Sequence, residues 1–439
     1  MTDYRIINSW GNYPKIKGEL IQTSNEEQLK KIINLKNTII PYGNGRSYGD
    51  SALNSCVVKY KSHRNNINFN RSKGIVEIDA GLKIGDLIDH VLPFGYFPPV
   101  VPGTKTVTVG GAIAADIHGK NHHVDGCISN HIISFNLMLQ NGHIVNCSKE
   151  LNSELFRATC GGMGLTGVIL NAKLKLISIK SNLIEQNSCK AKNIDELFSY
   201  FEYHDSRRFS VAWVDCFSSG NELGRGIYMS GDFLRNGIIN STNSYNFKFN
   251  IPDFCPTWLI NPFSQKIFNQ LYYNINGLNR KKTILIDYEN FFFPLDKILN
   301  WNRLYGKSGF LQYQFVIPKD NSIIGIKKIL NMISRSNHIS PLAVLKLFGK
   351  RNENYLSFPI KGYTLALDFK IQPDIFSFLD ELDKIVIDYG GRVYLAKDAR
   401  TVKNNFELGY PNIKEFRTFR SQSGLNNKFH SNQSLRLEL

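Results

Sequence analysis

Three histidines stand close together in the stretch TVGGAIAADIHGKNHH, residues 108–123, and clustered histidines suggest a metal site. His118 and His122 have the i, i+4 spacing that places two ligands on one side of a helix. Gly119 and Lys120 lie between them, which argues against a metal-binding helix. We therefore expect no metal here, and we expect at least one of the histidines to be structural.

Glycine-rich turns occur at three separate places in the first part of the chain. The loop PYGNGRSYGD, residues 41–50, has the pattern G-x-G-x-x-x-G and lacks the Gly-Lys-Ser/Thr of a phosphate loop. It offers a row of backbone N–H groups that can approach a diphosphate closely. The turns at Gly103, Gly110 and Gly111 are followed by small residues, so the backbone can pack flat against a large planar group. With GGMGLTG, residues 161–167, these turns predict an extended cofactor, because a single phosphate would not need three loops.

The segments that must position these turns indicate an α+β unit of short helices and strands up to about residue 178. SNEEQLKKIINLK, residues 24–36, is typical of a capped amphipathic helix, and GIVEIDAG, residues 74–81, alternates as a strand does. Asn141-Gly142 stands between two apolar runs, which predicts a β-hairpin. No long alternation of strands and helices occurs, so a doubly wound nucleotide fold is not expected.

The region from about residue 179 to residue 391 changes character. Strand-like segments such as RFSVAWVDCF, GFLQYQFVIP and YTLALDFKI alternate with helical ones, which predicts an antiparallel sheet with helices on it. Within this region, Phe247–Thr283 is aromatic, basic and weakly periodic. We expect a solvated loop there, with a lipid-facing lid as the alternative. Residues 392–439 begin with RVYLAKDARTV, which is typical of a strand, and continue as a polar tail.

The composition is that of a globular protein. The 439 residues, of which 42% are hydrophobic and 12% aromatic, suggest two domains. Seven scattered cysteines without a C-x-x-C pair indicate buried thiols in a reducing compartment. The first residues do not resemble a secretion signal, and no run of about eighteen apolar residues occurs, so we expect a cytoplasmic protein.

The formal net charge of +16 favours anionic partners. Nucleic acid, phosphorylated substrates and the acidic inner face of a membrane all belong to this class. The densest basic cluster is NRKKT, residues 279–283, and no nucleic-acid-binding motif accompanies it. We expect no nucleic-acid partner.

The three glycine-rich stretches together resemble the FAD-binding domain of the vanillyl-alcohol-oxidase class of flavoproteins. Within that class the chain is most similar to the decaprenylphosphoryl-β-D-ribose 2′-oxidase family. The resemblance continues through GFLQYQFVIP, LKLFGKRN, LSFPIKGYTLALDF and GGRVYLAKDART and covers nearly the whole chain. DIHGKNHH and YLAKD-RT are specific to this subgroup.

The resemblance implies an α+β, two-domain PCMH-type FAD-binding fold with an antiparallel-sheet substrate (cap) domain. The FAD-binding domain would span residues 1–178, the cap domain residues 179–391, and residues 392–439 would return to the FAD domain. In the family, the first loop wraps the FAD diphosphate, the second stretch lines the flavin, and two later positions complete the cofactor site. The corresponding residues here are Tyr42, Gly43, Asn44, Gly45, Arg46, Ser47, Tyr48, Gly49, Asp50, Ser51, Gly103, Thr108, Val109, Gly110, Gly111, Ala115, Asp116, Ile117, His118, Val168 and Tyr394.

The reaction that the resemblance implies is oxidation of a secondary sugar alcohol to a ketone, with a hydride going to the flavin and a proton to a base. Lys397 is the expected catalytic residue, either as a cation that stabilises an alkoxide or as a base whose pKa burial lowers. The expected substrate-binding residues are Tyr48, His118, Gln312, Gln314 and Lys346. Lys346 suits the phosphate as a point charge.

Two departures from the family pattern matter. Related sugar-lactone oxidases carry a histidine in the first loop that bonds covalently to the flavin, whereas this chain has Arg46, so FAD is expected to be noncovalent. Many family members have Asn and Cys where this chain has Thr364 and Ala366, so the fit of the substrate is expected to differ.

The expected substrate is a polyprenyl-phosphate-linked pentose oxidised at C2′, the first half of an epimerisation. A separate short-chain reductase would be the partner, and peripheral contact with the inner membrane surface would follow from the lipid. A soluble alditol or aldonolactone oxidase is the alternative within the class. A flavin-free binding protein for a nucleotide or glycolipid is the alternative outside it.

Overall fold

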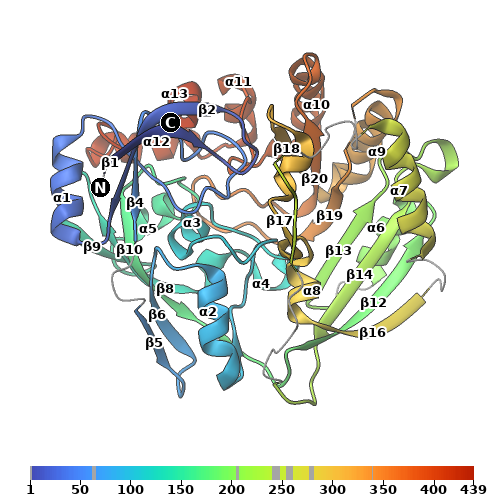
Figure 1. Ribbon diagram of the computed structural model, residues 1–439, viewed down its shortest axis with the longest axis horizontal. Coiled ribbons are helices and arrows are strands. Elements are labelled where there is room, and N and C mark those ends of the chain that lie inside the picture. Colours follow the sequence, from blue (N-terminus) through green and yellow to red (C-terminus); the bar gives the residue numbers. More distant parts are fainter. Residues whose placement is uncertain are drawn as a thin grey trace.

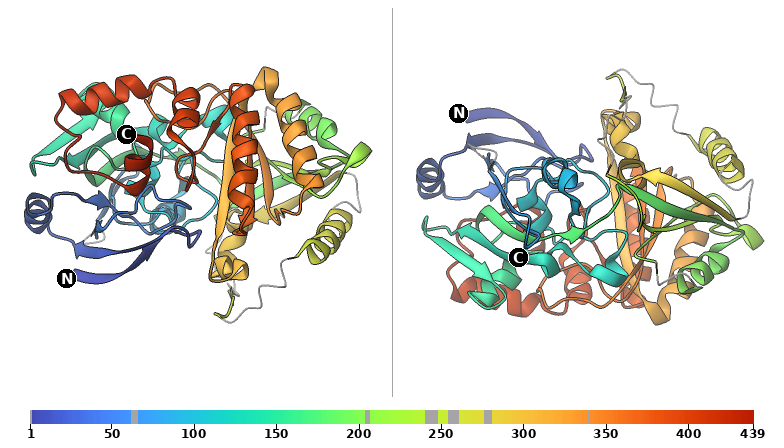
Figure 2. Two further views of the ribbon diagram at one scale, coloured as in Figure 1. Left: turned by 90° about the horizontal axis from the view of Figure 1, so that it is seen from above. Right: turned by 90° about the horizontal axis from the view of Figure 1, so that it is seen from below.

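The computed structural model describes residues 2–61, 66–203, 207–239, 248–253, 261–275, 281–338 and 340–439. Two halves lie side by side (Figure 1). In the view from above, the strands of the larger sheet lie between the N-terminal half and the helices α6 (Ile194–Tyr203), α9 (Lys319–Arg335) and α10 (Ile375–Asp388) of the other half (Figure 2). The chain has the two-domain α+β fold that the sequence predicts.

The first half contains a four-stranded sheet of order β1-β2-β4-β3, a five-stranded sheet of order β5-β6-β10-β8-β9 and the pair β11-β7. Its elements are β1 (Thr2–Asn8), β2 (Lys15–Thr23), α1 (Glu26–Leu35), β3 (Ile40–Pro41), β4 (Cys56–Tyr60), β5 (Ile67–Asn70), β6 (Ile75–Asp79), α2 (Ile84–Val91), η1 (Leu92–Phe94), β7 (Tyr96–Phe97), α3 (Val109–Ala114), α4 (His122–Asp125), η2 (Ile128–His131), β8 (Ile132–Met138), β9 (Ile144–Ser148), α5 (Ser153–Thr159), β10 (Val168–Lys175) and β11 (Ile177–Ser178).

The second half is built on an eight-stranded antiparallel sheet of order β16-β12-β14-β13-β19-β20-β18-β21, with the small pair β15-β17 beside it. Its elements are β12 (Leu183–Ala191), α6 (Ile194–Tyr203), β13 (Phe209–Val214), η3 (Gly220–Glu222), β14 (Gly226–Phe233), β15 (Phe249–Asn250), α7 (Pro262–Ile275), β16 (Lys281–Asp287), α8 (Tyr288–Phe292), η5 (Pro294–Lys297), β17 (Ile298–Leu299), η6 (Trp301–Tyr305), β18 (Phe310–Pro318), α9 (Lys319–Arg335), β19 (Ala343–Phe348), β20 (Gly362–Lys370), α10 (Ile375–Asp388) and β21 (Arg392–Val393).

The last part of the chain forms α11 (Lys403–Gly409), α12 (Ile413–Gln422) and α13 (Asn432–Leu437). These helices, red in Figure 1, lie over the N-terminal half. Phe406, Phe416 and Leu437 are buried in one cluster with Leu20 and Val57 of the first sheet. The C-terminal segment therefore packs mainly against the half that carries the glycine-rich loops.

Local sequence signals account for several of these elements. The Asn25 side chain accepts a hydrogen bond from the backbone N–H of Gln28 and so begins α1. β8 and β9 form the expected hairpin, and Gly142 has a φ of 77° at its turn, a conformation that glycine adopts without strain.

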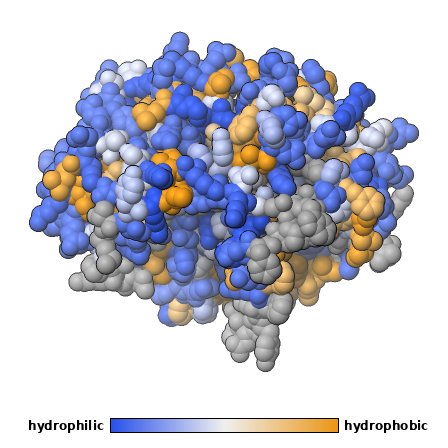
Figure 3. Space-filling model, turned by 45° about the horizontal axis from the view of Figure 1, so that its top comes forward, coloured by the Kyte–Doolittle hydropathy of each residue, from blue (hydrophilic) through white to orange (hydrophobic). Residues whose placement is uncertain are grey.

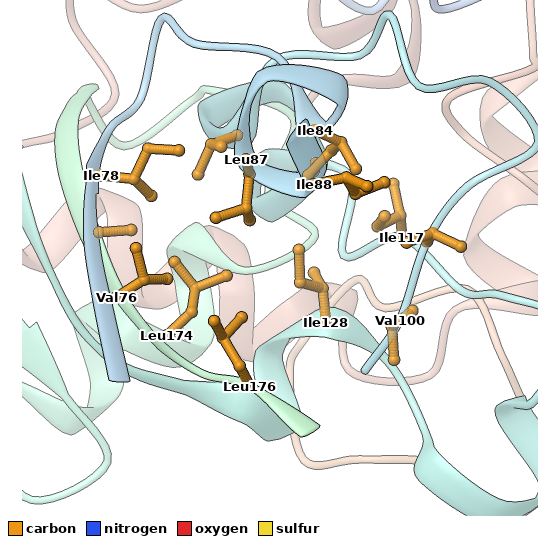
Figure 4. Close-up of a cluster of buried hydrophobic side chains, with 14 of the residues drawn as sticks. Val76, Ile78, Ile84, Leu87, Ile88, Val100, Ile117, Ile128, Leu174 and Leu176 are labelled. Atoms are coloured by element: carbon orange, nitrogen blue, oxygen red, sulfur yellow. The ribbon is translucent and has the colours of Figure 1, made fainter. Parts of the chain in front are cut away.

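Two hydrophobic cores hold the halves. In the first, Figure 4 shows Val76 of β6 and Leu174 of β10 facing Leu87 of α2. In the second, Leu365 and Leu367 of β20 are fully buried under helices α6, α9 and α10. Because side chains alternate along a strand, the other face of the large sheet carries different residues. These are Gln312 and Gln314 of β18, Lys346 of β19, and Thr364, Ala366 and Asp368 of β20.

Two expectations about secondary structure are wrong. RVYLAKDARTV is a strand only at Arg392–Val393, because the backbone N–H groups of Lys397 and Asp398 donate to the carbonyl oxygen of Tyr394 and turn the chain there. The loop expected over Phe247–Thr283 is wrong where residues 262–275 form α7. Residues 247, 254–260 and 276–280 of that segment lie outside the described residues.

The six cysteines within the described residues are free and buried, as expected, and Cys255 lies outside the described part. None of the described helices combines the length and the apolar composition needed to cross a membrane.

Candidate active site

The first glycine-rich loop, residues 42–51, lies against the second glycine-rich stretch. A Cβ atom at Gly43 would stand 2.6 Å from the Oγ1 atom of Thr108, so only glycine allows this approach. Asn44 bridges the two stretches, since its Nδ2 atom donates to the carbonyl oxygen of Thr106 at 3.0 Å. Arg46 places its guanidinium 4.2 Å from the ring centroid of Trp10.

The third glycine-rich turn holds the helix of the second stretch from the other side. The backbone N–H of Gly161 donates to Ile113 and that of Met163 donates to Ala114. The structure therefore brings together the three turns that the sequence singled out.

The same first loop also meets the turn that carries Lys397. The Tyr48 backbone N–H donates to the carbonyl oxygen of Ala396 at 3.0 Å. A Cβ atom at Gly49 would overlap the carbonyl oxygen of Asp398, so the two backbones are in direct contact. The Lys397 ammonium lies 3.7 Å from the ring centroid of Tyr48. The expected catalytic lysine therefore faces the expected cofactor loop.

Arg436 of α13 ties the two segments together from behind. Its Nη2 atom lies 2.8 Å from a carboxylate oxygen of Asp50 and 2.8 Å from one of Asp398. Its Nη1 atom donates to the carbonyl oxygen of Thr401. Burial opposes the ionisation of Asp398. The charge of Arg436 and the hydrogen bonds from the backbone N–H groups of Arg400 and Thr401 nevertheless hold the pKa of Asp398 below its usual range. Arg436 is thus the shared cation of two buried carboxylates.

His118 packs, buried, against the face of the large sheet that carries Gln314 and Thr364. Its Nε2 atom is 3.1 Å from Nε2 of Gln314, whose amide also donates to Thr364 at 3.2 Å. Its ring packs 4.7 Å from that of Phe348 and 5.2 Å from that of Tyr394. Burial first, and then the nearby lysines, lower the pKa of His118 well below its ordinary value. The imidazole is therefore neutral at pH 7.

Asp368 is the centre of a second polar group on this face. Gln312 donates to its Oδ1 atom at 2.6 Å, and the Tyr305 hydroxyl lies 3.5 Å from its Oδ2 atom. The Gln312 side chain also interacts with the hydroxyl of Tyr48, which faces Lys397. This group connects the sheet to the first loop.

Burial shifts the pKa values of three side chains in this region toward neutrality. Burial lowers the pKa of Lys397 to about 7, where Asp368 opposes the shift and Lys346 adds to it. Burial also raises the pKa of Asp368 to about 7 and lowers that of Lys346 to about 8. A base poised near the working pH is the arrangement that general base catalysis favours.

Several residues on the expected cofactor list turn their side chains elsewhere. The Asp116 carboxylate accepts hydrogen bonds from Asn352, Asn354 and Ser357, so it anchors a neighbouring loop. The side chains of Val109, Ile117 and Val168 are buried in hydrophobic clusters. Tyr394 contacts the second stretch directly, since its hydroxyl donates to the carbonyl oxygen of Ala115 at 3.1 Å.

Three residues that the sequence analysis did not single out belong to this site. Asp368 lies on the same face of β20 as Thr364 and Ala366. The alternation of side chains along this strand could therefore have predicted that Asp368 faces the site. Lys120 is buried, donates to the carbonyl oxygen of Phe291 and has a pKa that burial lowers to about 7. Arg436 had no local signal, because its partner Asp50 lies 386 residues earlier.

The residues present fit an extended flavin nucleotide. In the described part of the chain, no residue accepts a hydrogen bond from the backbone N–H groups of residues 43–47. Nε of Arg46 and Nδ1 of His118 are buried and have no partner among the described residues. A Cβ atom at Gly103 would meet open space. These donors are those that a diphosphate and a flavin ring would satisfy.

Comparisons with known proteins agree with this fit. A family model for the FAD binding domain matches residues 19–148. Decaprenylphosphoryl-beta-D-ribose oxidase of Mycolicibacterium smegmatis is 34% identical over 100% of this chain and 98% of that protein. An uncharacterized protein of Streptomyces coelicolor is 29% identical over 80% of this chain and 99% of that protein. L-gulonolactone oxidase of Mus musculus is 27% identical, but over only 38% of each chain.

The Arg436 contacts generate a stability prediction. Arg436→Met would leave Asp50 and Asp398 buried without their cation, and we expect it to lower the free energy of unfolding by about 3–5 kcal/mol. The control is Lys403→Met, which removes a more exposed ion pair with Glu438 and should cost about 1 kcal/mol or less. Urea unfolding followed by circular dichroism measures both, and equal losses would contradict the shared-cation role.

Proposed function

Because this chain belongs to the decaprenylphosphoryl-β-D-ribose oxidase family of FAD-dependent oxidoreductases, we propose that it oxidises the C2′ hydroxyl of a polyprenyl-phosphate-linked pentose to a ketone. The cofactor is FAD, and the reaction class is the oxidation of a sugar alcohol. The observation that carries the finer proposal is the placement of Lys397 over Tyr48, beside the polar groups of Asp368 and His118.

Lys397 acts as the general base in this proposal. Bound FAD would supply the acceptor for the hydride that leaves the alcohol carbon. The proton of the same alcohol passes to the Nζ atom of neutral Lys397, and the carbon–oxygen double bond forms. A pKa of about 7 makes the neutral amine available at physiological pH.

The remaining polar residues bind and orient the sugar. Gln314 and neutral His118 offer hydrogen bonds to the hydroxyls, and Gln312 places a further amide beside Tyr48. Lys346 is the cation for the phosphate: burial lowers its pKa only to about 8, so the amine is mostly charged at pH 7, and a phosphate beside it would favour the charged form further. Thr364 stands where many relatives have Asn, and it holds Gln314 rather than contacting the sugar through an amide.

Residues of the glycine-rich loops hold FAD without a covalent bond in this proposal. Arg46 occupies the position where related lactone oxidases carry their tethering histidine, and its guanidinium packs on Trp10. The backbone N–H groups of residues 43–47 bind the diphosphate, while Asp50 and Asp116 shape the site through their protein partners.

The product needs a second enzyme. A keto-sugar becomes an inverted alcohol only when a hydride is returned, so a separate short-chain reductase is the proposed partner. Since the lipid of such a substrate lies in a membrane, we also propose that the protein works at the cytoplasmic face of the inner membrane.

Removal of the base should stop the chemistry and spare the cofactor. We expect Lys397→Met to lower kcat by about 10²–10⁴-fold while the protein stays yellow. Lys397→Arg should not rescue the rate, because arginine remains protonated. Substrate-dependent bleaching with polyprenyl-phosphoryl ribose measures the rate, and the exposed Lys384→Met is the matched control. A fully active Lys397→Met enzyme would exclude Lys397 as the base.

The pH dependence of kcat should report the same amine. Activity should rise with pH through about 7, since only neutral Lys397 accepts the proton. Asp368 raises the pKa of Lys397, so Asp368→Asn should move the rising limb to lower pH. The charge of Lys346 lowers the pKa of Lys397, so Lys346→Met should move the rising limb of the pH profile to higher pH. Shifts of both variants in the same direction would contradict the assignment.

Acid precipitation tests how the flavin is held. The supernatant of the denatured protein should be yellow, because Arg46 forms no bond to the flavin. A yellow pellet and a colourless supernatant would show a covalent link and refute this part of the proposal.

A further inference from the structure

Helix α7 buries a polar side chain and a tyrosine and exposes its aliphatic and phenylalanine side chains, together with Lys266, Gln270 and Asn274. Only Asn269 and Tyr273 are buried on this helix. The exposed apolar side chains are between 45% and 74% accessible and are Phe263, Ile267, Phe268, Leu271 and Ile275. Four of the five follow one another at i, i+4 steps, so they form one stripe along the helix. Tyr273 is two residues from Leu271, which places it on the opposite side.

Polar contacts hold the inner side of α7 to the large sheet. Asn269 donates to Asp215 at 2.8 Å, and Arg225 donates to Gln270 at 2.8 Å. The Tyr273 hydroxyl donates to the carbonyl oxygen of Ala191 at 3.0 Å. The helix is therefore fixed in an orientation that exposes its apolar stripe to solvent.

An outward apolar stripe of this size calls for an occupant, because soluble proteins rarely leave such a surface uncovered. Figure 3 shows a hydrophobic patch at the right-hand edge, where α7 lies in Figure 1, besides other patches on the mainly hydrophilic face in view. Two further views show α7 on the outside of the molecule, away from the N-terminal half (Figure 2).

The charges near the stripe select the occupant. Within the chain segment of α7 no Asp or Glu occurs between Asp253 and Asp287, whereas Lys266 on α7 and Lys282 on β16 are exposed. The carboxylates beside the inner side of α7, Asp215 and Glu222, are both paired with Arg225. A second copy of this chain would bring another basic surface, with a net charge of +16 on each molecule. An anionic lipid surface supplies both the apolar phase and the complementary charge.

The sheet connects α7 to the candidate active site. Tyr273 packs against Trp213, and the strand register pairs Trp213 with Val344, Val344 with Ala366, and Ala366 with Gln314. Directly paired residues of antiparallel strands point to the same face. Three strand steps of about 4.8 Å place Trp213 roughly 14 Å from Gln314. Helix α7 therefore covers the same face of the sheet that carries the sugar-binding residues.

We propose that the outward stripe of α7 is an interfacial helix that docks the protein on an anionic membrane surface, on the side from which a lipid-linked substrate reaches the sheet face. The statement about the lipid-linked substrate rests on the proposed function, whereas the docking of α7 on a membrane surface does not. Lipid binding and sugar oxidation are therefore tested by separate measurements.

The test is sedimentation of the full-length flavoprotein with vesicles of phosphatidylcholine containing phosphatidylglycerol. The variant carries Phe263→Ser, Ile267→Ser and Leu271→Ser, which lie on the outward stripe and leave the stacking of Phe268 on Tyr272 and the inner contacts of α7 intact. We expect the wild-type protein to bind these vesicles. The affinity of the triple variant should be lower by a factor of about ten or more. The matched control carries Leu35→Ser, Ile324→Ser and Leu408→Ser, which are equally exposed on other helices, and it should bind as the wild type does.

Equal binding by the triple variant and the wild type would overturn the proposal, as would equal binding to vesicles of pure phosphatidylcholine. A wild-type dimer in sedimentation velocity that the triple variant abolishes would also overturn it, because the occupant would then be a second copy. Flavin bleaching by detergent-solubilised polyprenyl-phosphoryl ribose should be the same in all three proteins. Absence of bleaching in all three would refute the proposed substrate and leave the vesicle result standing.

Discussion

The candidate active site depends on one backbone contact, the approach of Gly49 to the peptide of Asp398. A side chain at position 49 would occupy the space of the Asp398 carbonyl oxygen. Glycine removes that obstacle, so the first loop and the turn that carries Lys397 can share a hydrogen bond from Tyr48 to Ala396. The ring of Tyr48 and the ammonium of Lys397 face each other only while this contact holds. The large sheet then adds Gln312, and with it Asp368, to a site that neither half contains alone.

Burial of so many ionisable groups in one place gives the site its chemical character. Two lysines, Lys346 and Lys397, stand near a single carboxylate, Asp368, and each pKa is shifted toward neutrality by burial. In a region of low dielectric constant, the protonation of each group depends on the others. An anionic substrate would favour the charged form of Lys346 directly, and a charged Lys346 would in turn lower the pKa of Lys397. Binding of the phosphate and readiness of the base are thus compatible in the same site.

Local patterns predicted much of this structure, and contacts between distant segments account for what they missed. The hairpin at Asn141-Gly142 follows from a turn that two adjacent residues specify, and the glycine-rich loops follow from a conformation that only glycine adopts freely. The expected strand after Arg392 ends early, because the backbone N–H groups of Lys397 and Asp398 bond back to Tyr394 in a turn. Helix α7 escaped prediction since its apolar residues face outward, the reverse of the usual pattern. The Asp50–Arg436 pair joins residues too far apart for any local signal.

The distance between these two partners has a consequence for the newly made protein. Asp50 leaves the ribosome 386 residues before Arg436 does, which at about 5–20 residues per second is a delay of roughly 20–80 s. Throughout that interval the first loop has been made, but Asp50 lacks the cation beside which it is buried in the folded protein. The mature loop, with its ion pair, can therefore form only after α13 has been synthesised, so the first loop waits for a much later part of its own chain.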